Sequence, residues 1–384
     1  MKVLITGGAG FIGSHLAEKL IKADHQVVVV DNLSTGRLAN LENIKDHPNL
    51  QFVQDDISNP HTMHLLIEMC DCIYHLAAAV GVQLIVEQPV RTIKTNIHGT
   101  EVVLEIANKF RKKILIASSS EVYGKSETVP FSEDDDTVLG STRFSRWSYA
   151  CSKAIDEFLG LAYFQQYQLP VIITRFFNTV GPRQTGRYGM VIPRFVEAAL
   201  SNQPLVVYGD GHQTRCFAHV NDVINAVVPL MAHPLAPGAV YNIGSTQEIS
   251  INNLAGKIIE LTNSKSEIKH ISYHEAFGQP FDDMRRRVPS LKRIQQLIQY
   301  HPDYTIDSRH PQRVNTKEEY DALNKGKDMA VYREYMKNQV REILTNYGKI
   351  DILWLDFSFP GEFGKGRDDW GSVELIKMVR KLQP

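Results

Sequence analysis

A tyrosine and a lysine four residues apart have the types and the spacing of a proton-transfer pair. Tyr149 and Lys153 fall in a stretch whose pattern predicts a helix, where residues i and i+4 project from one face. A phenol loses its proton near about pH 10, and an adjacent ammonium would stabilise the phenolate and lower that value. Such pairs are also common on helix surfaces, so their interpretation as a general base depends on the surrounding motifs.

Two further candidates for catalysis follow a predicted strand at residues 114–118. Ser119 comes directly after this strand and is placed to hydrogen-bond the same substrate hydroxyl as Tyr149. Glu121 is the second candidate, either as a catalytic carboxylate or as a structural one that accepts backbone amides.

A glycine-rich turn at the start of the chain has the pattern of a dinucleotide-binding loop. Gly7, Gly10 and Gly13 lie between an apolar strand and a helical pattern, where glycines let the backbone approach a pyrophosphate at a helix N-terminus. Asp31 ends the next predicted strand and is placed to accept hydrogen bonds from the adenosine ribose. Its charge would repel a 2′-phosphate, so the expected cofactor is NAD rather than NADP. The positive nicotinamide ring of this cofactor would join the ammonium of Lys153 in lowering the pKa of Tyr149.

The other candidates for the NAD site lie in the same turn or follow the later strands. Asp56 and Ile57 come after the third strand and would flank the adenine, and residues 76–78 come after the fourth and would pass close to the cofactor. Besides Tyr149, Lys153, Asp31 and the three glycines, the expected set is Phe11, Ile12, Asn32, Asp56, Ile57, Leu76, Ala77, Ala78 and Asn96.

The elements that position these residues alternate between short apolar strands and helices. This alternation predicts a Rossmann α/β fold with a doubly wound parallel sheet, and such sheets bind ligands at the carboxyl ends of their strands. Residues 1–177 form the expected NAD-binding domain with the catalytic helix, and 178–300 form a smaller, interleaved substrate subdomain. A fresh α–β–α passage follows over 301–384 and is expected to be an appended unit.

Composition narrows the class of protein. The 384 residues are 43% hydrophobic and 22% charged, with a formal net charge of -1, which gives no field to gather nucleic acid or an anionic membrane. No apolar run approaches the roughly 18–20 residues of a membrane span. The four cysteines lack the spacing of a zinc site or a disulfide framework, so we expect no metal and a cytoplasmic location.

Together, these motifs resemble the extended short-chain dehydrogenase/reductases of the nucleotide-sugar epimerase/dehydratase family. The likeness covers residues 1 to about 300 and includes GGAGFIG at 7–13, HLAA at 75–78, SSSEVYG at 118–124, RFFNTVGPR at 175–183 and QTRCF at 213–217. It implies a 4-keto intermediate on a UDP-linked sugar, and a homodimer. The substrate contacts that it implies are Ser119, Ser120, Asn178, Val191, Arg215 and Arg287.

The resemblance leaves two reactions open, decarboxylation of UDP-glucuronate and 4-epimerisation of UDP-glucuronate or UDP-glucose. The 4,6-dehydratases of the family carry Asp-Glu where this chain has Ser120-Glu121, so dehydration is disfavoured. The decarboxylases resemble this chain at Glu121, whereas many 4-epimerases resemble it around 178–182 and 188–193. A catalytically silent NAD-binding protein is disfavoured by the presence of Ser119, Tyr149 and Lys153.

The C-terminal stretch, 301–384, resembles an internal fragment of a family 29 α-L-fucosidase. By this likeness Asp356 stands where that family has its nucleophile, and Glu362 and Asp369 are acid candidates by proximity only. Retaining hydrolysis needs two carboxyl groups about 5 Å apart, and the segment supplies only a few elements of an eight-stranded barrel. Glycoside hydrolysis is therefore the alternative function, and we expect the segment to be inactive as a fucosidase.

Overall fold

The chain divides into two compact units, Met1–Pro302 and Asp303–Pro384. The structure, a computed structural model, describes residues 1–81, 87–186, 190–277, 284–300, 302 and 377–378. The expected barrel fragment at 301–384 lies outside the described residues, except for two residues of one helix.

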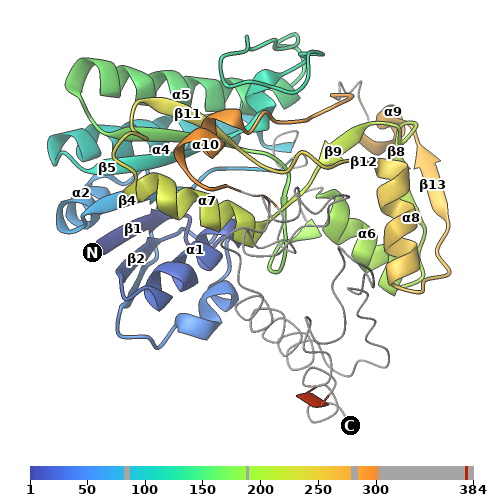
Figure 1. Cartoon of the computed structure of the whole chain (residues 1–384), viewed down its shortest axis with the longest axis horizontal. Coiled ribbons are helices and arrows are strands. Elements are labelled where there is room, and N and C mark those ends of the chain that lie inside the picture. The colour runs from blue at the N-terminus through green and yellow to red at the C-terminus, as the bar shows by residue number, and fades with distance from the viewer. Residues whose placement is uncertain (82–86, 187–189, 278–283, 301, 303–376, 379–384) are drawn as a thin grey trace, which may run out of the picture. The chain divides into compact units, whose positions relative to one another are not determined.

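A seven-stranded parallel sheet forms the centre of the first unit (Figure 1). Its order is β11-β6-β5-β4-β1-β2-β3, so the chain runs outward from β1 in one direction and then crosses to β4 to continue in the other. The predicted doubly wound fold is confirmed. The strands are β1 Lys2–Thr6, β2 Gln26–Val30, β3 Leu50–Val53, β4 Cys72–His75, β5 Lys113–Ser119, β6 Val171–Phe176 and β11 Ala239–Ile243.

Helices cover both faces of this sheet, which explains why its strands are apolar throughout rather than alternating. In β2, for example, the four consecutive valines from Val27 to Val30 are at most 1% exposed. One core packs helices α1 Phe11–Lys22, α7 Val220–Ala232 and α10 Lys292–Leu297 on the sheet. The opposite core packs α2 Pro60–Met69, α4 Pro89–Lys109 and α5 Arg146–Tyr167.

The loops that leave β1 and β4 approach each other where the strand order reverses. Gly7 has φ +70°, and a Cβ there would lie 2.8 Å from Cα of Ala77. Only glycine fits both the left-handed backbone and this contact. The carboxyl edge between β1 and β4 is therefore the crevice in which an open α/β sheet binds its ligand.

A smaller lobe follows β6 and has its own apolar core. It contains α6 Val191–Leu200 and α8 Ile251–Leu261, with β8 Leu205–Tyr208 paired to β13 Ile268–Ile271. Strands β9 Thr214–Cys216 and β12 Glu248–Ser250 pair antiparallel. Between these pieces the chain returns to the main sheet through α7 and β11, so the lobe is interleaved with the sheet.

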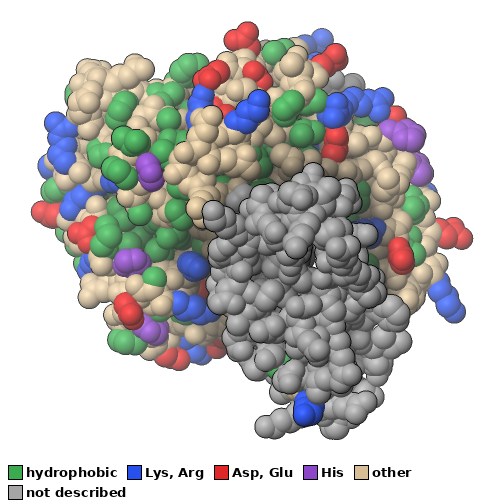
Figure 2. Space-filling model, viewed as in Figure 1, with side chains coloured by type: hydrophobic (Ala, Val, Ile, Leu, Met, Phe, Trp, Pro, Cys, Tyr) green, Lys and Arg blue, Asp and Glu red, His purple; other side chains and the backbone are tan. Residues whose placement is uncertain are grey.

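Short elements complete the described part of the first unit. They are the 3-10 helices η1 Leu38–Ile44 and η2 Ser120–Tyr123, the paired strands β7 Thr179–Val180 and β10 Ala218–His219, and helix α9 Tyr273–Phe277. On the face shown in Figure 2, basic and acidic side chains of the described residues are interspersed rather than gathered by sign.

A buried ion pair joins α5 to the sheet. The guanidinium of Arg175 in β6 donates to both carboxylate oxygens of Glu157 in α5, with Nη2 2.7 Å from Oε2 and Nε 3.0 Å from Oε1. The hydroxyl of Ser118 in β5 donates to the same carboxylate. The two side chains are 8% and 7% exposed, so each charge depends on the other for its solvation.

We predict that Glu157→Gln destabilises the protein by about 3 to 5 kcal/mol, because it leaves the buried Arg175 charge without its counter-ion. Urea unfolding measures the change. The matched control is Glu42→Gln, which removes an exposed pair to Lys45 and is expected to cost less than about 1 kcal/mol. Equal losses for the two variants would contradict this account of the pair.

Candidate active site

A cavity of about 1170 Å³ opens at the carboxyl edge of the sheet, between the sheet and the smaller lobe. This volume exceeds that of a typical small-molecule site, so it has room for two extended ligands. Of the site residues predicted from sequence, all but Asn96 line it. Those on the cofactor side lie around β1, β2 and β4, and Asn178, Val191 and Arg215 lie on the side of the smaller lobe.

The glycine turn forms one wall of the cavity at the N-terminus of α1. Gly10 is the N-cap residue of this helix and carries no side-chain cap, and a Cβ at Gly13 would lie 2.4 Å from the carbonyl oxygen of Gly7. Phe11 and Ile12 line the same wall. No side chain therefore covers the backbone amides at the N-terminus of α1, where the helix dipole favours an anion. This arrangement fits a dinucleotide pyrophosphate.

Asp31 is held rigidly beside this turn. Its carboxylate accepts the amides of Ala9 at 3.0 Å and Leu33 at 2.8 Å. Burial raises the pKa of Asp31, while these two hydrogen bonds act in the opposite direction. A carboxylate has about four acceptor positions, so two remain for ribose hydroxyls.

The expected adenine-side residues form a polar rim. The side-chain amide of Asn32 donates to Asp56 at 2.7 Å, and the backbone amide of Ser58 donates to its other oxygen at 2.9 Å. Burial acts to raise the pKa of Asp56, but the hydrogen bonds from Ser58 and Asn32 outweigh it and the pKa is lowered. Ile57 and the loop 76–78 line the cavity beside this rim.

Asn96 does not line the cavity but lies buried behind its wall. It is 1% exposed, accepts the amide of Ala79 at 2.8 Å and donates to the hydroxyl of Ser152 at 3.1 Å. It thus fastens the loop after β4 to α5, and its predicted role in binding the cofactor directly stays a prediction.

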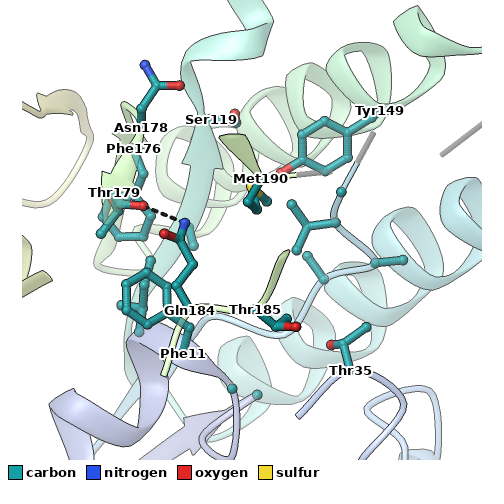
Figure 3. Close-up of a pocket in the computed structure, with 18 of the residues that line it drawn as sticks. Phe11, Thr35, Ser119, Tyr149, Phe176, Asn178, Thr179, Gln184, Thr185 and Met190 are labelled. Carbon is teal, nitrogen blue, oxygen red and sulfur yellow. Dashed lines mark hydrogen bonds between the residues drawn. The ribbon is translucent and has the colours of Figure 1, made fainter. Parts of the chain in front are cut away.

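Tyr149 and Ser119 come together at the centre of the cavity, from α5 and from the end of β5 (Figure 3). Tyr149 is 7% exposed and hydrogen-bonds Ser119. Burial and the charge of Glu121 raise the pKa of Tyr149, and the bond to Ser119 lowers it only in part. In the protein by itself, burial therefore outweighs the effects that lower this pKa, and Lys153 is paired to Asp156 at 3.0 Å. The expected lowering by the ammonium of Lys153 together with the nicotinamide ring stays a prediction.

Glu121 lies between two arginines. One oxygen accepts from Nη2 of Arg287 at 2.7 Å, and the other lies 3.4 Å from Nη2 of Arg146. All three residues line the cavity with Tyr149 and the buried Ser120. Arg146 was not among the site residues expected from sequence. It is the first residue of α5, the helix that carries Tyr149, and this position could have indicated that it lies near Tyr149.

The expected substrate residues on the smaller lobe are fixed by backbone contacts. The side-chain amide of Asn178 donates to the carbonyl of Cys216 at 3.3 Å, and Nη1 of Arg215 donates to the carbonyls of Thr214 and Met284. Val191 begins α6. These contacts fix the positions of the Asn178 and Arg215 side chains along the cavity. The roles of all three residues in binding substrate stay predictions.

Arg183 and Gln184 are cavity residues that the sequence reasoning did not select. Arg183 donates to the hydroxyl of Ser14 at 3.1 Å and pairs with Glu18, both in α1, so it clasps its loop onto the helix of the glycine turn. Gln184 donates to the carbonyl of Thr179 at 2.9 Å (Figure 3). Arg183 belongs to the expected RFFNTVGPR motif, which is the only signal that pointed to it.

The described residues show neither a metal-binding cluster nor a membrane-spanning helix. Among them, no group of three or more His, Cys, Asp or Glu side chains is arranged to hold a metal ion. No helix within the described ranges is both long and apolar enough to cross a membrane.

The fold and the cavity agree with the family match. Residues 4–310 match the model described as GDP-mannose 4,6 dehydratase, and the chain belongs to this family. Residues 241–384 match the α-L-fucosidase model. The second match confirms the resemblance of the C-terminal segment and extends it back into the first unit as far as β11.

Among curated relatives, the chain is 44% identical over 303 residues to the UDP-N-acetyl-α-D-glucosaminuronate decarboxylase of Bacillus cytotoxicus, covering 79% of this chain and 93% of the relative. It is 38% identical over 304 residues to UDP-glucuronic acid decarboxylase 1 of Xenopus tropicalis, covering 78% and 68%.

Solved structures include Pal from Bacillus thuringiensis, with a TM-score of 0.71 and 32% identity over 79% of this chain and 94% of that one. They also include a UDP-glucuronic acid 4-epimerase from Bacillus cereus in complex with UDP-glucuronic acid and NAD. For this structure the TM-score is 0.71 and the identity 27%, covering 85% and 99%.

We predict that Glu121→Gln lowers the pKa of Tyr149, because it removes the negative charge that opposes the phenolate most strongly. Absorbance titration of tyrosinate, taken as the difference from the same protein with Tyr149→Phe, measures the change. Since the base form is the active one, the rise of activity with pH should move to lower pH in the variant. An unchanged titration in the folded variant would contradict this electrostatic account.

Proposed function

We propose that the protein is an NAD-dependent decarboxylase of a UDP-linked uronic acid, acting through a 4-keto intermediate. The observation that carries the proposal is the carboxylate of Glu121 between Arg287 and Arg146, beside Tyr149 in one cavity. The decarboxylase relatives support it, since the matched region of this chain spans most of the Bacillus relative's length.

NAD fits the cofactor side of the cavity. The bare glycine turn suits the pyrophosphate, and Asp31 has acceptor positions for the ribose. The related dTDP-glucose 4,6-dehydratase of Bacillus anthracis was solved in complex with NAD, at 31% identity. When bound, the nicotinamide ring accepts a hydride from C4 of the sugar.

The first step needs a proton acceptor at the C4 hydroxyl, and we assign that role to Tyr149. Its phenolate takes the hydroxyl proton as the C4 hydride leaves, and the hydroxyl of Ser119 orients the same oxygen. Lys153 supplies a positive charge on the same helix face that favours the phenolate and is placed to hold the nicotinamide ribose.

The second step follows from the ketone. In the 4-keto uronic acid the C6 carboxylate is β to the C4 carbonyl, so the C5–C6 bond can break and release carbon dioxide. The electron pair moves into an enolate at the C4 oxygen, which is stabilised by the proton that Tyr149 now carries, and C5 then takes a proton to give the 4-keto pentose. Return of the hydride to C4 and of the Tyr149 proton to its oxygen would give the UDP-pentose and restore the phenolate. The two arginines and Glu121 sum to one positive charge, enough to attract a carboxylate without holding it as tightly as two uncompensated arginines would.

A 4-epimerase is the second candidate. It uses the same oxidation and differs in turning the 4-keto sugar before reduction. The fold similarity to the UDP-glucuronic acid 4-epimerase of Bacillus cereus favours it. The product of the reaction separates the two candidates.

Glycoside hydrolysis is the weaker alternative. The fucosidase match begins at 241, inside the first unit, and that unit's residues from Tyr241 to Ile243 form part of the Rossmann strand β11. The matched segment therefore includes part of a Rossmann strand, and it is too short to supply the eight strands of a whole fucosidase barrel. The roles of Asp356, Glu362 and Asp369 lie outside the described residues.

We also infer a homodimer and a cytoplasmic location. Helices α4 and α5 pack side by side and carry exposed apolar side chains, among them Val90, Ile155 and Phe158, the last 74% exposed. A second copy of this helix pair would cover them. The four cysteines are free, which suits a reducing compartment.

Incubation with UDP-glucuronate and UDP-N-acetylglucosaminuronate should release carbon dioxide and give a UDP-pentose or its 4-keto form. Mass spectrometry of the nucleotide products measures this. Tyr149→Phe should abolish the reaction and leave NAD binding intact, because it removes only the proton acceptor. A product that keeps all its carbons and has inverted C4 would establish the epimerase instead, and no product from either sugar would sink both candidates.

For the dimer, Phe158→Glu should give monomers, because it places a charge in the apolar face of α5. Light scattering after gel filtration measures the mass. Leu235→Glu is the matched control, since Leu235 is 75% exposed outside α4 and α5. A wild-type monomer, or a dimer that survives Phe158→Glu, would contradict the inferred interface.

A further inference from the structure

One side chain of the sheet, Asn242, hydrogen-bonds three separate segments of the chain. It lies in β11, at one end of the sheet order, and is 0% exposed. A side-chain amide buried in this way destabilises the fold unless its oxygen and its two N–H groups are hydrogen-bonded. Its partners come from η2, from the loop at Phe131 and from the segment that follows Arg287.

The first contact leads to Glu121. The hydroxyl of Tyr123, the last residue of η2, donates to Oδ1 of Asn242 at 2.8 Å. Tyr123 is buried, and its ring stacks on that of Phe131 with 4.6 Å between the centroids. Glu121 precedes Tyr123 by two residues in the same short helix, so the contact with Asn242 fixes the backbone from which the Glu121 carboxylate extends.

The other two contacts lead to Arg287. Nδ2 of Asn242 donates to the carbonyl oxygens of Phe131 at 2.9 Å and of Ser290 at 3.2 Å. These two segments are also joined directly. The amide of Phe131 donates to the carbonyl of Val288, and the amide of Ser290 donates to the carbonyl of Phe131, both at 2.8 Å. The chain is therefore held in place immediately after Arg287.

The neighbours of Asn242 fix the direction in which its amide points. The two carbonyl oxygens only accept, so they face the N–H groups, and Oδ1 is left to accept the hydroxyl of Tyr123. A reversed amide would place its oxygen against both carbonyls, and so would an aspartate of the same shape. The contacts therefore specify an asparagine side chain in one orientation, with both of its polar atoms in use.

The backbone of Asn242 is also fixed. In the pairing of β11 with β6 it lies opposite Arg175, and its own amide donates to Oε1 of Glu133 at 2.8 Å. Nη1 of Arg175 donates to the carbonyl oxygen of Glu133 at 3.2 Å, so the same loop contacts both strands. Asn242 therefore has a set place in the sheet, on the strand next to the buried pair of Arg175 and Glu157.

The segment before Arg287 is held by the smaller lobe instead. Arg286 donates to both carboxylate oxygens of Glu248 in β12, at 2.9 and 2.8 Å. Nη1 of Arg285 donates to Asp210, in the turn after β8, at 2.8 Å. Arg287 therefore lies between a segment bound to the lobe and a segment bound to the sheet. Its partner Glu121 follows β5 of the sheet, so the contacts through Asn242 are those that hold the two charges together.

We propose that Asn242 is a positioning residue for the pair of Glu121 and Arg287. It sets both partners from one point in the sheet, η2 through the hydroxyl of Tyr123 and the segment after Arg287 through the carbonyl of Ser290. Nη2 of Arg287 lies 2.7 Å from Oε1 of Glu121, and a charged hydrogen bond of this length requires both backbones to stay in place. The catalytic consequence of this inference rests on the proposed function, in which the pair meets the carboxylate of the sugar.

The first test measures the coupling within the pair and needs no turnover. Urea unfolding of Glu121→Gln, Arg287→Gln and the double variant gives the coupling free energy by a double-mutant cycle. In a Tyr123→Phe background, which removes only the link to η2, this coupling should fall by about half or more. Tyr241→Phe is the matched control, because it removes a buried hydroxyl bonded to the carbonyl of Ala236, one residue along β11. A coupling unchanged by Tyr123→Phe, or reduced equally by Tyr241→Phe, would overturn the proposal.

The second test uses Asn242→Ala, which removes the contacts to both segments. In the NAD-loaded protein, kcat for decarboxylation should fall by about tenfold or more, while the Kd of UDP, which has no sugar carboxylate, changes by less than about twofold. A folded Asn242→Ala protein with unchanged kcat would contradict the positioning role. If the unaltered protein decarboxylates neither UDP-uronate, the proposed function fails, and the coupling measured with Tyr123→Phe decides this inference by itself.

Discussion

The ion pair between Glu157 and Arg175 is the interaction on which the site depends. It locks α5, which carries Tyr149 and Lys153, onto β6, and the same carboxylate receives the hydroxyl of Ser118, the neighbour of Ser119. Tyr149 and Ser119, to which we assign proton transfer and orientation of the substrate, are thereby positioned from two elements by one buried contact. A buried pair of this kind adds little net stability compared with apolar packing, and so its value is in geometry.

A second constraint is electrostatic. Tyr149 is buried in the protein, and burial with two nearby carboxylates makes its phenolate costly. The positive charges are placed separately: Arg287 and Arg146 pair with Glu121, Lys153 lies on the same helix as Tyr149, and the pyridinium ring of NAD would add a further charge in the proposed function. The site is therefore built so that proton acceptance is favoured chiefly when cofactor is present.

Much of the central sheet was predictable because its signals are local. The strands around the glycine turn and the helix of Tyr149 follow from apolar runs and turn residues, and the predicted strand at 114–118 lies within the observed β5. Strand β11 was not anticipated, because it returns to the sheet after an excursion through the smaller lobe, and no local pattern encodes that return. Arg146 was missed for the same reason, because its partner Glu121 lies 25 residues away in the sequence.

The pKa of Tyr149 shows where motif reasoning stops. The i, i+4 spacing correctly placed Tyr149 and Lys153 on one helix, but the direction of the shift depends on burial and on Glu121 and Asp156. Charge partners of this kind come from the tertiary structure, and a motif does not list them.

The central claim is that catalysis begins with oxidation at C4 of a UDP-uronate. The direct measurement is rapid mixing of the NAD-loaded protein with UDP-glucuronate carrying deuterium at C4, followed by the absorbance of reduced nicotinamide. The account predicts a transient reduced-nicotinamide signal that forms more slowly with the deuterated sugar. Product formation with no such signal and no isotope effect would contradict it.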